Sequence, residues 1–124
     1  DTDAGSDDYM AIAFLLARPD VKIEALTVVN GLAHVEPGVR NLEALLKLSG
    51  KTGISVYPGR STPLAGSNEF PAAWRQTSDD LPGVSLPRDS SVARREPALA
   101  YYQNRLKQPA RILALGPLTN LAEA

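Results

Sequence analysis

Hydrophobic and polar positions along the chain alternate between two spacings, one typical of helices and one of strands. Helical spacing predicts helices at residues 8–17, 37–48, 91–106 and from Leu118 onward, and a short helix is compatible with 72–76. Pro19 ends the first helix, because the residue before a proline avoids the helical region. Pro97 predicts a break or a start within the third. The first helix is so rich in apolar residues that we expect it to be largely buried.

Strand-like segments fall between these helices, at residues 21–29, 54–57 and 110–115. The first alternates and then becomes continuously apolar, as expected of a parallel strand buried on both faces. Alternating strands and helices predict an α/β fold: an open, mostly parallel sheet with flanking helices, right-handed crossovers and Rossmann-like order. The chain opens on a charged loop and closes inside a predicted helix. We therefore expect residues 1–124 to be a fragment of a longer protein that lacks the strand before the loop.

Composition narrows the range of partners. Hydrophobic residues make up 44% and charged residues 22% of the chain, as in ordinary globular domains. The net charge of -1 favours neither a nucleic-acid nor an anionic membrane partner. No apolar run approaches the ~18 residues that a membrane span requires. Cysteine is absent from the sequence, which excludes disulfides and thiolate catalysis.

The strongest chemical signal is the acidic loop of residues 1–8, which holds Asp1, Asp3, Asp7 and Asp8. Carboxylates this close repel one another, and a hard cation such as Ca²⁺ or Mg²⁺ would compensate them. Gly5 permits a turn that brings the second pair back toward the first. Asp3 and Asp8 could then share a cation, while Asp7 accepts hydrogen bonds from a substrate hydroxyl. The simpler alternative is helix capping plus solvated charge.

Two further turns are predicted at the same edge of the sheet, because each follows the carboxyl end of a parallel strand. Ligands of open α/β sheets bind outside these carboxyl ends. Asn30 ends the first predicted strand, and its amide can donate to one oxygen and accept from another. The alternative for Asn30 is a simple turn residue. Leu115 ends the last predicted strand, and its backbone carbonyl could complete the oxygen shell of a cation.

Other site types fit less well. A Mg²⁺-dependent phosphohydrolase of the haloacid dehalogenase type would use Asp1 as nucleophile and Asp3 as acid/base. That interpretation leaves Asp7 and Asp8 unexplained, and it expects Ser or Thr where the chain has Asn30. His34 is the only histidine of the chain. A lone histidine is more often a surface or capping residue than a catalytic one.

These residues resemble a known family. Residues 1–8, DTDAGSDD, are similar to the Asp-x-Asp-Pro-Gly-x-Asp-Asp signature of the inosine-uridine-preferring nucleoside hydrolases. The segments LTVVN (26–30), RN (40–41), VYPG (56–59) and ALGPLTN (114–120) resemble further segments of that family, in the same order. The resemblance therefore spans nearly the whole chain.

The resemblance implies a Ca²⁺-dependent N-glycosyl hydrolase that splits ribonucleosides into free base and ribose, within nucleoside salvage. Asp3 would bind Ca²⁺ and act as the general base on the metal-bound water. Asp8 and the carbonyl of Leu115 would be further Ca²⁺ ligands, and Asp7 and Asn30 would hold ribose hydroxyls. A non-catalytic nucleoside- or sugar-binding relative is the alternative. The fragment alone is expected to be inactive, since the family's remaining ligand lies in its C-terminal half.

The sequence departs from the family pattern at three places, one of which is the spacing between Asn30 and Arg40, one residue longer than in the family. Ala4 replaces the signature proline, and residues 70–87 lack the family's His-Gly-x-x-Gly-like loop, which contacts the base. Base preference is therefore not predicted. We expect a small-molecule nucleoside as partner, with neither nucleic acid nor membrane. We also expect a cytoplasmic protein and, by analogy with the family, one that forms homo-oligomers.

Overall fold

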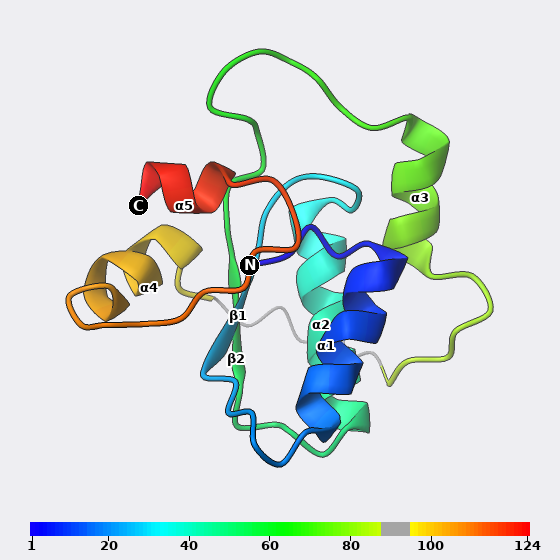
Figure 1. Cartoon of the computed structure of the whole chain (residues 1–124). Coiled ribbons are helices and arrows are strands. Elements are labelled where there is room, and N and C mark those ends of the chain that lie inside the picture. The colour runs from blue at the N-terminus through cyan, green and yellow to red at the C-terminus, as the bar shows by residue number, and fades with distance from the viewer. Residues whose placement is uncertain (88–94) are drawn as a thin grey trace.

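A computed structural model describes residues 1–87 and 95–124 of the chain (Figure 1). The described elements follow the predicted alternation of helix and strand. In chain order they are α1 (Ser6–Ala17), β1 (Ala25–Val28), α2 (Val35–Leu48), β2 (Ser55–Pro58), α3 (Ala72–Asp80), α4 (Ala98–Arg105) and α5 (Thr119–Glu123). None of the helices in the described ranges is long and apolar enough to span a bilayer.

The sheet is parallel and includes the first residues of the chain. β1 pairs with β2, with Val28 opposite Pro58. On the other side of β1, Thr2 forms a parallel bridge with Val28. The backbone N–H of Thr2 donates to the carbonyl of Thr27 at 3.0 Å, and that of Val29 donates to the carbonyl of Thr2 at 2.9 Å. The acidic loop therefore begins at the end of a sheet segment.

The predicted strand at 110–115 has no regular strand structure, and the prediction is wrong in that sense. Its last residues nevertheless run parallel to Asp1: the amine of Asp1 donates to the carbonyl of Leu113, and the N–H of Leu115 donates to the carbonyl of Asp1, both at 2.9 Å. These two bonds are too few to define a strand. The order across the sheet is thus 113–115, 1–3, β1, β2.

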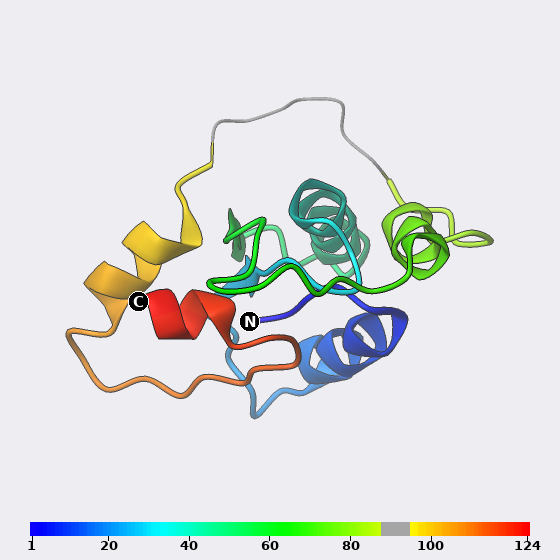
Figure 2. The ribbon, with the colours of Figure 1, turned by 90° about the horizontal axis from the view of Figure 1, so that it is seen from above.

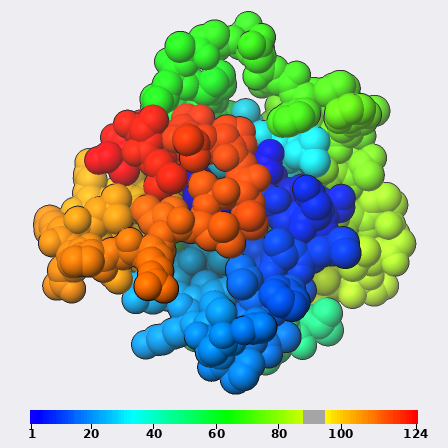
Figure 3. Space-filling view, in the orientation of Figure 1, coloured from blue at the N-terminus to red at the C-terminus, as the bar shows by residue number. Residues whose placement is uncertain are grey.

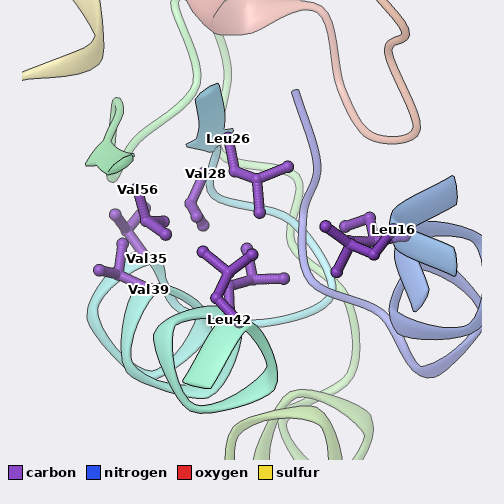
Figure 4. Packing of buried hydrophobic residues seen from close by; sticks show 9 residues of the cluster. Leu16, Leu26, Val28, Val35, Val39, Leu42 and Val56 are labelled. Atoms are coloured by element: carbon purple, nitrogen blue, oxygen red, sulfur yellow. The ribbon is translucent and has the colours of Figure 1, made fainter. Parts of the chain in front are cut away.

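Helices cover both faces of the sheet, which confirms the predicted α/β fold (Figure 2). Leu26 and Val28 of β1 point toward α1 and α2, and with Val56 of β2 they pack against apolar residues of both helices to form the core cluster (Figure 4). Thr27 and Tyr57 point to the other face, because successive side chains of a strand alternate. There the Thr27 hydroxyl bonds the Tyr102 hydroxyl of α4 at 2.7 Å, and Tyr57 stacks on Tyr101 of α4 at 4.4 Å.

Several element predictions need correction. The first helix is not largely buried: Met10 and Phe14 are 75% and 62% exposed, because only the face with Ile12 and Leu16 meets the core. β1 covers only the end of the predicted strand at 21–29. α4 begins directly after Pro97, which has no N–H to offer a preceding turn. Residues 91–94 of that predicted helix, including the expected serine cap, lie outside the described residues.

Candidate active site

Asp3 is fixed between two glycines at the carboxyl edge of the sheet. A Cβ added to Gly31 would lie 2.3 Å from Oδ2 of Asp3, and one added to Gly116 would lie 2.7 Å from its backbone nitrogen. Oδ2 of Asp3 accepts a hydrogen bond from the N–H of Leu32 at 2.8 Å. The structure therefore brings the acidic loop, the turn after β1 and the turn after 113–115 together, as the predicted convergence requires.

This place has the geometry that open α/β sheets use for ligands. The segments 1–3 and 113–115 are neighbours in the sheet, but the chain reaches β1 and β2 on one side before it returns to form 113–115 on the other. Ligand sites of such sheets lie at the carboxyl ends of strands where the order reverses. Asp3 and Leu115 stand at that reversal. In the side view of Figure 3, an opening is visible at the top of the molecule beneath the arch formed by the segment between β2 and α3.

Asp8, in the first turn of α1, is a second buried carboxyl at this edge. It is 5% exposed and Asp3 is 8% exposed. The pKa of Asp8 is raised from 3.8 to about 6, mainly by burial and also by the charges of Asp3 and Asp7, while the hydroxyl of Thr2, which donates to Oδ2 of Asp8, opposes the rise. The structure therefore holds Asp8 where its own charge is disfavoured unless something positive is present.

Asp7 is exposed and folds back over Gly5. A Cβ at Gly5 would lie 2.8 Å from Oδ1 of Asp7 and 4.0 Å from Oδ1 of Asp3, so the two carboxylates flank the same glycine. Ala4 takes a left-handed conformation with φ of 57°, and its N–H donates to the hydroxyl of Thr2 at 2.9 Å. A proline could neither take this φ, because its ring holds φ near −65°, nor make this hydrogen bond, because it has no N–H. The departure from the signature at Ala4 thus changes the local backbone.

The acidic residues fit a hard cation only in part. In residues 1–87 and 95–124, no set of three or more His, Cys, Asp or Glu side chains is arranged to hold a metal ion. Asp3 and Asp8 supply two buried carboxylates, and the oxygen chemistry of this pair suits Ca²⁺ or Mg²⁺. Leu115 lies directly before Gly116, which contacts Asp3, so a backbone carbonyl is close by. The described residues can thus form part of a cation site.

Asn30 lies at the predicted edge, but its amide is already engaged. Nη2 of Arg75, from α3, donates to Oδ1 of Asn30 at 2.5 Å. Arg75 therefore already uses one of the two lone pairs of this acceptor oxygen, which leaves less of it for the predicted bond from a ligand. The next residue along, Gly31, is the one that contacts Asp3.

α3 occupies the region that lacks the family's base-contacting loop, and Asp79 anchors it to α2. The carboxylate of Asp79 accepts from the backbone N–H of His34 at 2.8 Å and contacts its ring Nδ1 at 2.6 Å. The carbonyl of Asp79 accepts from the amide of the buried Asn41 at 2.9 Å. His34 thus joins two helices, and Trp74 of α3 remains 60% exposed.

Asn120 connects three parts of the edge. Its Nδ2 donates to Oδ1 of Asp1 at 2.9 Å and to the carbonyl of Val28 at 3.2 Å, while its Oδ1 accepts from the N–H of Arg60 at 2.8 Å. Asp1 also accepts from the hydroxyl of Thr27 at 2.8 Å. These bonds hold Asp1 at the start of the acidic loop, and Asn120 was not among the predicted site residues.

Comparison with known proteins agrees with the resemblance. The sequence model described as "Inosine-uridine preferring nucleoside hydrolase" matches residues 1–124. Uridine nucleosidase 1 of Arabidopsis thaliana is 35% identical over 127 residues, covering 100% of this chain and 38% of the relative. The pyrimidine-specific ribonucleoside hydrolase RihA of Escherichia coli O1:K1 / APEC is 31% identical over 98% of this chain and 40% of the relative.

Solved structures show the same fold. An inosine-guanosine nucleoside hydrolase superposes with a TM-score of 0.79 at 30% identity, over 97% of this chain and 38% of that protein. A purine-preferring ribonucleoside hydrolase from Gardnerella vaginalis gives 0.79 at 28% identity, over 98% and 40%. The chain thus spans about two fifths of the length of the relatives it matches.

Proposed function

Because the chain belongs to the inosine-uridine preferring nucleoside hydrolase family, we propose that the protein hydrolyses the N-glycosidic bond of ribonucleosides to free base and ribose. The observation that carries this proposal is the placement of Asp3 and Asp8, two buried carboxyls, at the reversal point of the parallel sheet. We propose further that the chain is the N-terminal portion of one nucleoside hydrolase-like domain, in line with its share of the relatives' length. Homo-oligomerisation and a cytoplasmic location stay predictions.

Asp3 is proposed as the general base that takes the proton from the attacking water. A base must be held in a fixed direction to act efficiently. Asp3 packs against Gly31 and Gly116 so closely that a Cβ at either glycine would clash with it. The N–H of Leu32 donates to the carboxylate of Asp3 and orients it. Those contacts support a fixed position for Asp3.

Asp3, Asp8 and the backbone carbonyl of Leu115 are proposed to hold Ca²⁺, with further ligands from outside the described residues. When bound, the cation lowers the pKa of water and so supplies a nucleophile near neutral pH. The raised pKa of Asp8 supports this role, because a nearby positive charge would stabilise its ionised form.

Asp7 and Asn30 are proposed to bind the hydroxyls of the ribose. Asp7 is exposed beside Asp3, and Asn30 precedes the glycine that contacts Asp3. Glycosidic cleavage passes through a transition state with positive charge on the sugar. Anionic oxygens next to the sugar would stabilise that charge more than the neutral ground state, which is what accelerates a reaction.

The test is a ribose-release assay on the full-length protein across uridine, cytidine, inosine and guanosine, with Ca²⁺ or with a chelator. The proposal expects turnover of at least one nucleoside, its loss with the chelator, and its loss in Asp3→Asn without a change in the thermal midpoint. Ca²⁺ binding without turnover would instead indicate a binding protein. Release of phosphate from phosphate esters in place of ribose would refute the assignment.

A further inference from the structure

Arg75 is a buried cation at the edge that holds the proposed sugar site. Its side chain belongs to α3 and the residue is 4% exposed. Nη1 pairs with Glu69 at 3.1 Å, and Nη2 donates to Oδ1 of Asn30 at 2.5 Å. Among the described residues, Nε of Arg75 is buried without a hydrogen-bond partner. Burying a guanidinium with an unpaired N–H costs free energy, which the contacts with Glu69 and Asn30 oppose.

The contact determines which way the amide of Asn30 faces. A guanidinium carries only donors, so the atom of Asn30 that meets it must be the carbonyl oxygen Oδ1. Nδ2, with its two N–H donors, then points away from Arg75. The backbone of Asn30 is held too, because its N–H donates to the carbonyl of Arg60 at 3.0 Å. Asn30 can therefore offer its amide to a ligand as a donor.

We propose that Arg75 is a positioning residue that fixes Asn30 as a hydrogen-bond donor to the sugar. One ribose hydroxyl would accept from Nδ2 of Asn30, and a hydroxyl would donate to the carboxylate of Asp7, which can only accept when ionised. Arg75 touches Asn30 and acts on the substrate through it. This inference rests on the proposed function, which supplies the sugar.

The test measures ribose release by variants of the full-length protein. Arg75→Met removes the donors and is expected to lower kcat/KM roughly tenfold, the effect of a lost hydrogen bond to a charged group. Arg75→Lys, which keeps a donor and the charge, should restore part of this loss. In an Asn30→Ala background, Arg75→Met should add no further loss, because both changes remove one interaction.

Arg105→Met is the matched control. Arg105 also pairs with a carboxylate, that of Glu24 at 2.7 Å, but directly before β1 and so at the opposite edge of the sheet. It should leave kcat/KM unchanged. Losses from Arg75→Met that add fully to those of Asn30→Ala, or the absence of any loss, would overturn the inference.

A spectroscopic readout separates this inference from the proposed function. If the unmodified protein releases no ribose, the proposed function fails, and the side-chain amide resonances of Asn30 in ¹⁵N-labelled protein still report the contact. Arg75→Met should shift them and Arg105→Met should not. Unshifted resonances in Arg75→Met would refute the positioning role whether or not the enzyme is active.

Discussion

Replacing Gly31 by alanine is the sharpest perturbation of the acidic edge. The new Cβ would lie 2.3 Å from Oδ2, 2.5 Å from Cβ and 2.8 Å from Cγ of Asp3. Rotating the Asp3 carboxylate cannot relieve these contacts, since its own Cβ is among them. Either Asp3 or the turn after β1 must move. Overpacking of this kind costs about 1–3 kcal/mol.

The displacement should reduce catalysis more than folding. Asp3 is the proposed base, and misplacing a reacting group by about 1 Å can cost on the order of 100-fold in rate. We therefore expect Gly31→Ala in the full-length protein to fold, to lose about 1–3 kcal/mol of unfolding free energy, and to lose on the order of 100-fold in kcat/KM. Ribose release measures the second effect and urea unfolding the first.

Gly53→Ala is the control for this experiment. A Cβ at Gly53 meets no atom within 4 Å, and Gly53 has no positive φ. The change should stay within about 0.5 kcal/mol in stability, as surface substitutions usually do, and should leave kcat/KM unaltered. If Gly31→Ala keeps full kcat/KM, or loses no more than Gly53→Ala, then the prediction that the new Cβ displaces a catalytic Asp3 is wrong.

Two further predictions concern the same loop. Restoring the signature proline, Ala4→Pro, should destabilise the protein by more than about 1 kcal/mol in urea unfolding, because proline fits neither the φ of 57° nor the hydrogen bond to Thr2. Ala4→Gly should instead stabilise by about 1 kcal/mol, and a stabilising Ala4→Pro would contradict this view of the loop. Asp8→Asn should remove any stabilisation by Ca²⁺. In the presence of a chelator at pH 7, Asp8→Asn should raise the free energy of unfolding by about 1–2 kcal/mol. The rise in the pKa of Asp8 from 3.8 to about 6 corresponds to about 3 kcal/mol of destabilisation before solvent screening is taken into account. Since the folded pKa is the higher one, the stability contributed by Asp8 is full below pH 3.8 and is lost as pH rises through about 6, so unfolding from pH 4 to 8 tests the sign.

The convergence of the site could be predicted because it depends on topology. Alternating strands and helices place the carboxyl ends of parallel strands at one edge. Asp3, the turn after Asn30 and the turn after Leu115 meet there in the structure. The prediction of a regular strand at 110–115 was wrong although its run of apolar residues is present in the sequence. Among the described residues, the segment makes strand-like backbone hydrogen bonds only with Asp1, which are too few to define a strand. The local sequence predicts hydrophobic spacing, but it does not predict which segments pair as strands.

Arg75 and Asp79 could not be predicted, because their position depends on where α3 docks. The stretch from Gly59 to Pro87 has no periodic pattern that ties it to an edge of the sheet. A buried arginine gives no signal in sequence either, since arginine is usually exposed. Asn120 was within reach, because it lies in the segment 114–120 that resembles the family. The bonds of its amide to Asp1 and Val28 depend on the folded arrangement of three segments.

Gly31 and Gly116 correctly predict turns, but the structure requires glycine at these positions for a different reason. In the sequence, Gly31 and Gly116 are typical turn markers, and turns do occur there. Yet neither has a positive φ, so the turns alone do not require glycine. What requires it is the approach of Asp3, whose atoms come within 2.9 Å of a Cβ at either position. A substitution at these glycines therefore acts through the contact with Asp3 and not through a required φ, and we expect its effect on catalysis to exceed its effect on stability.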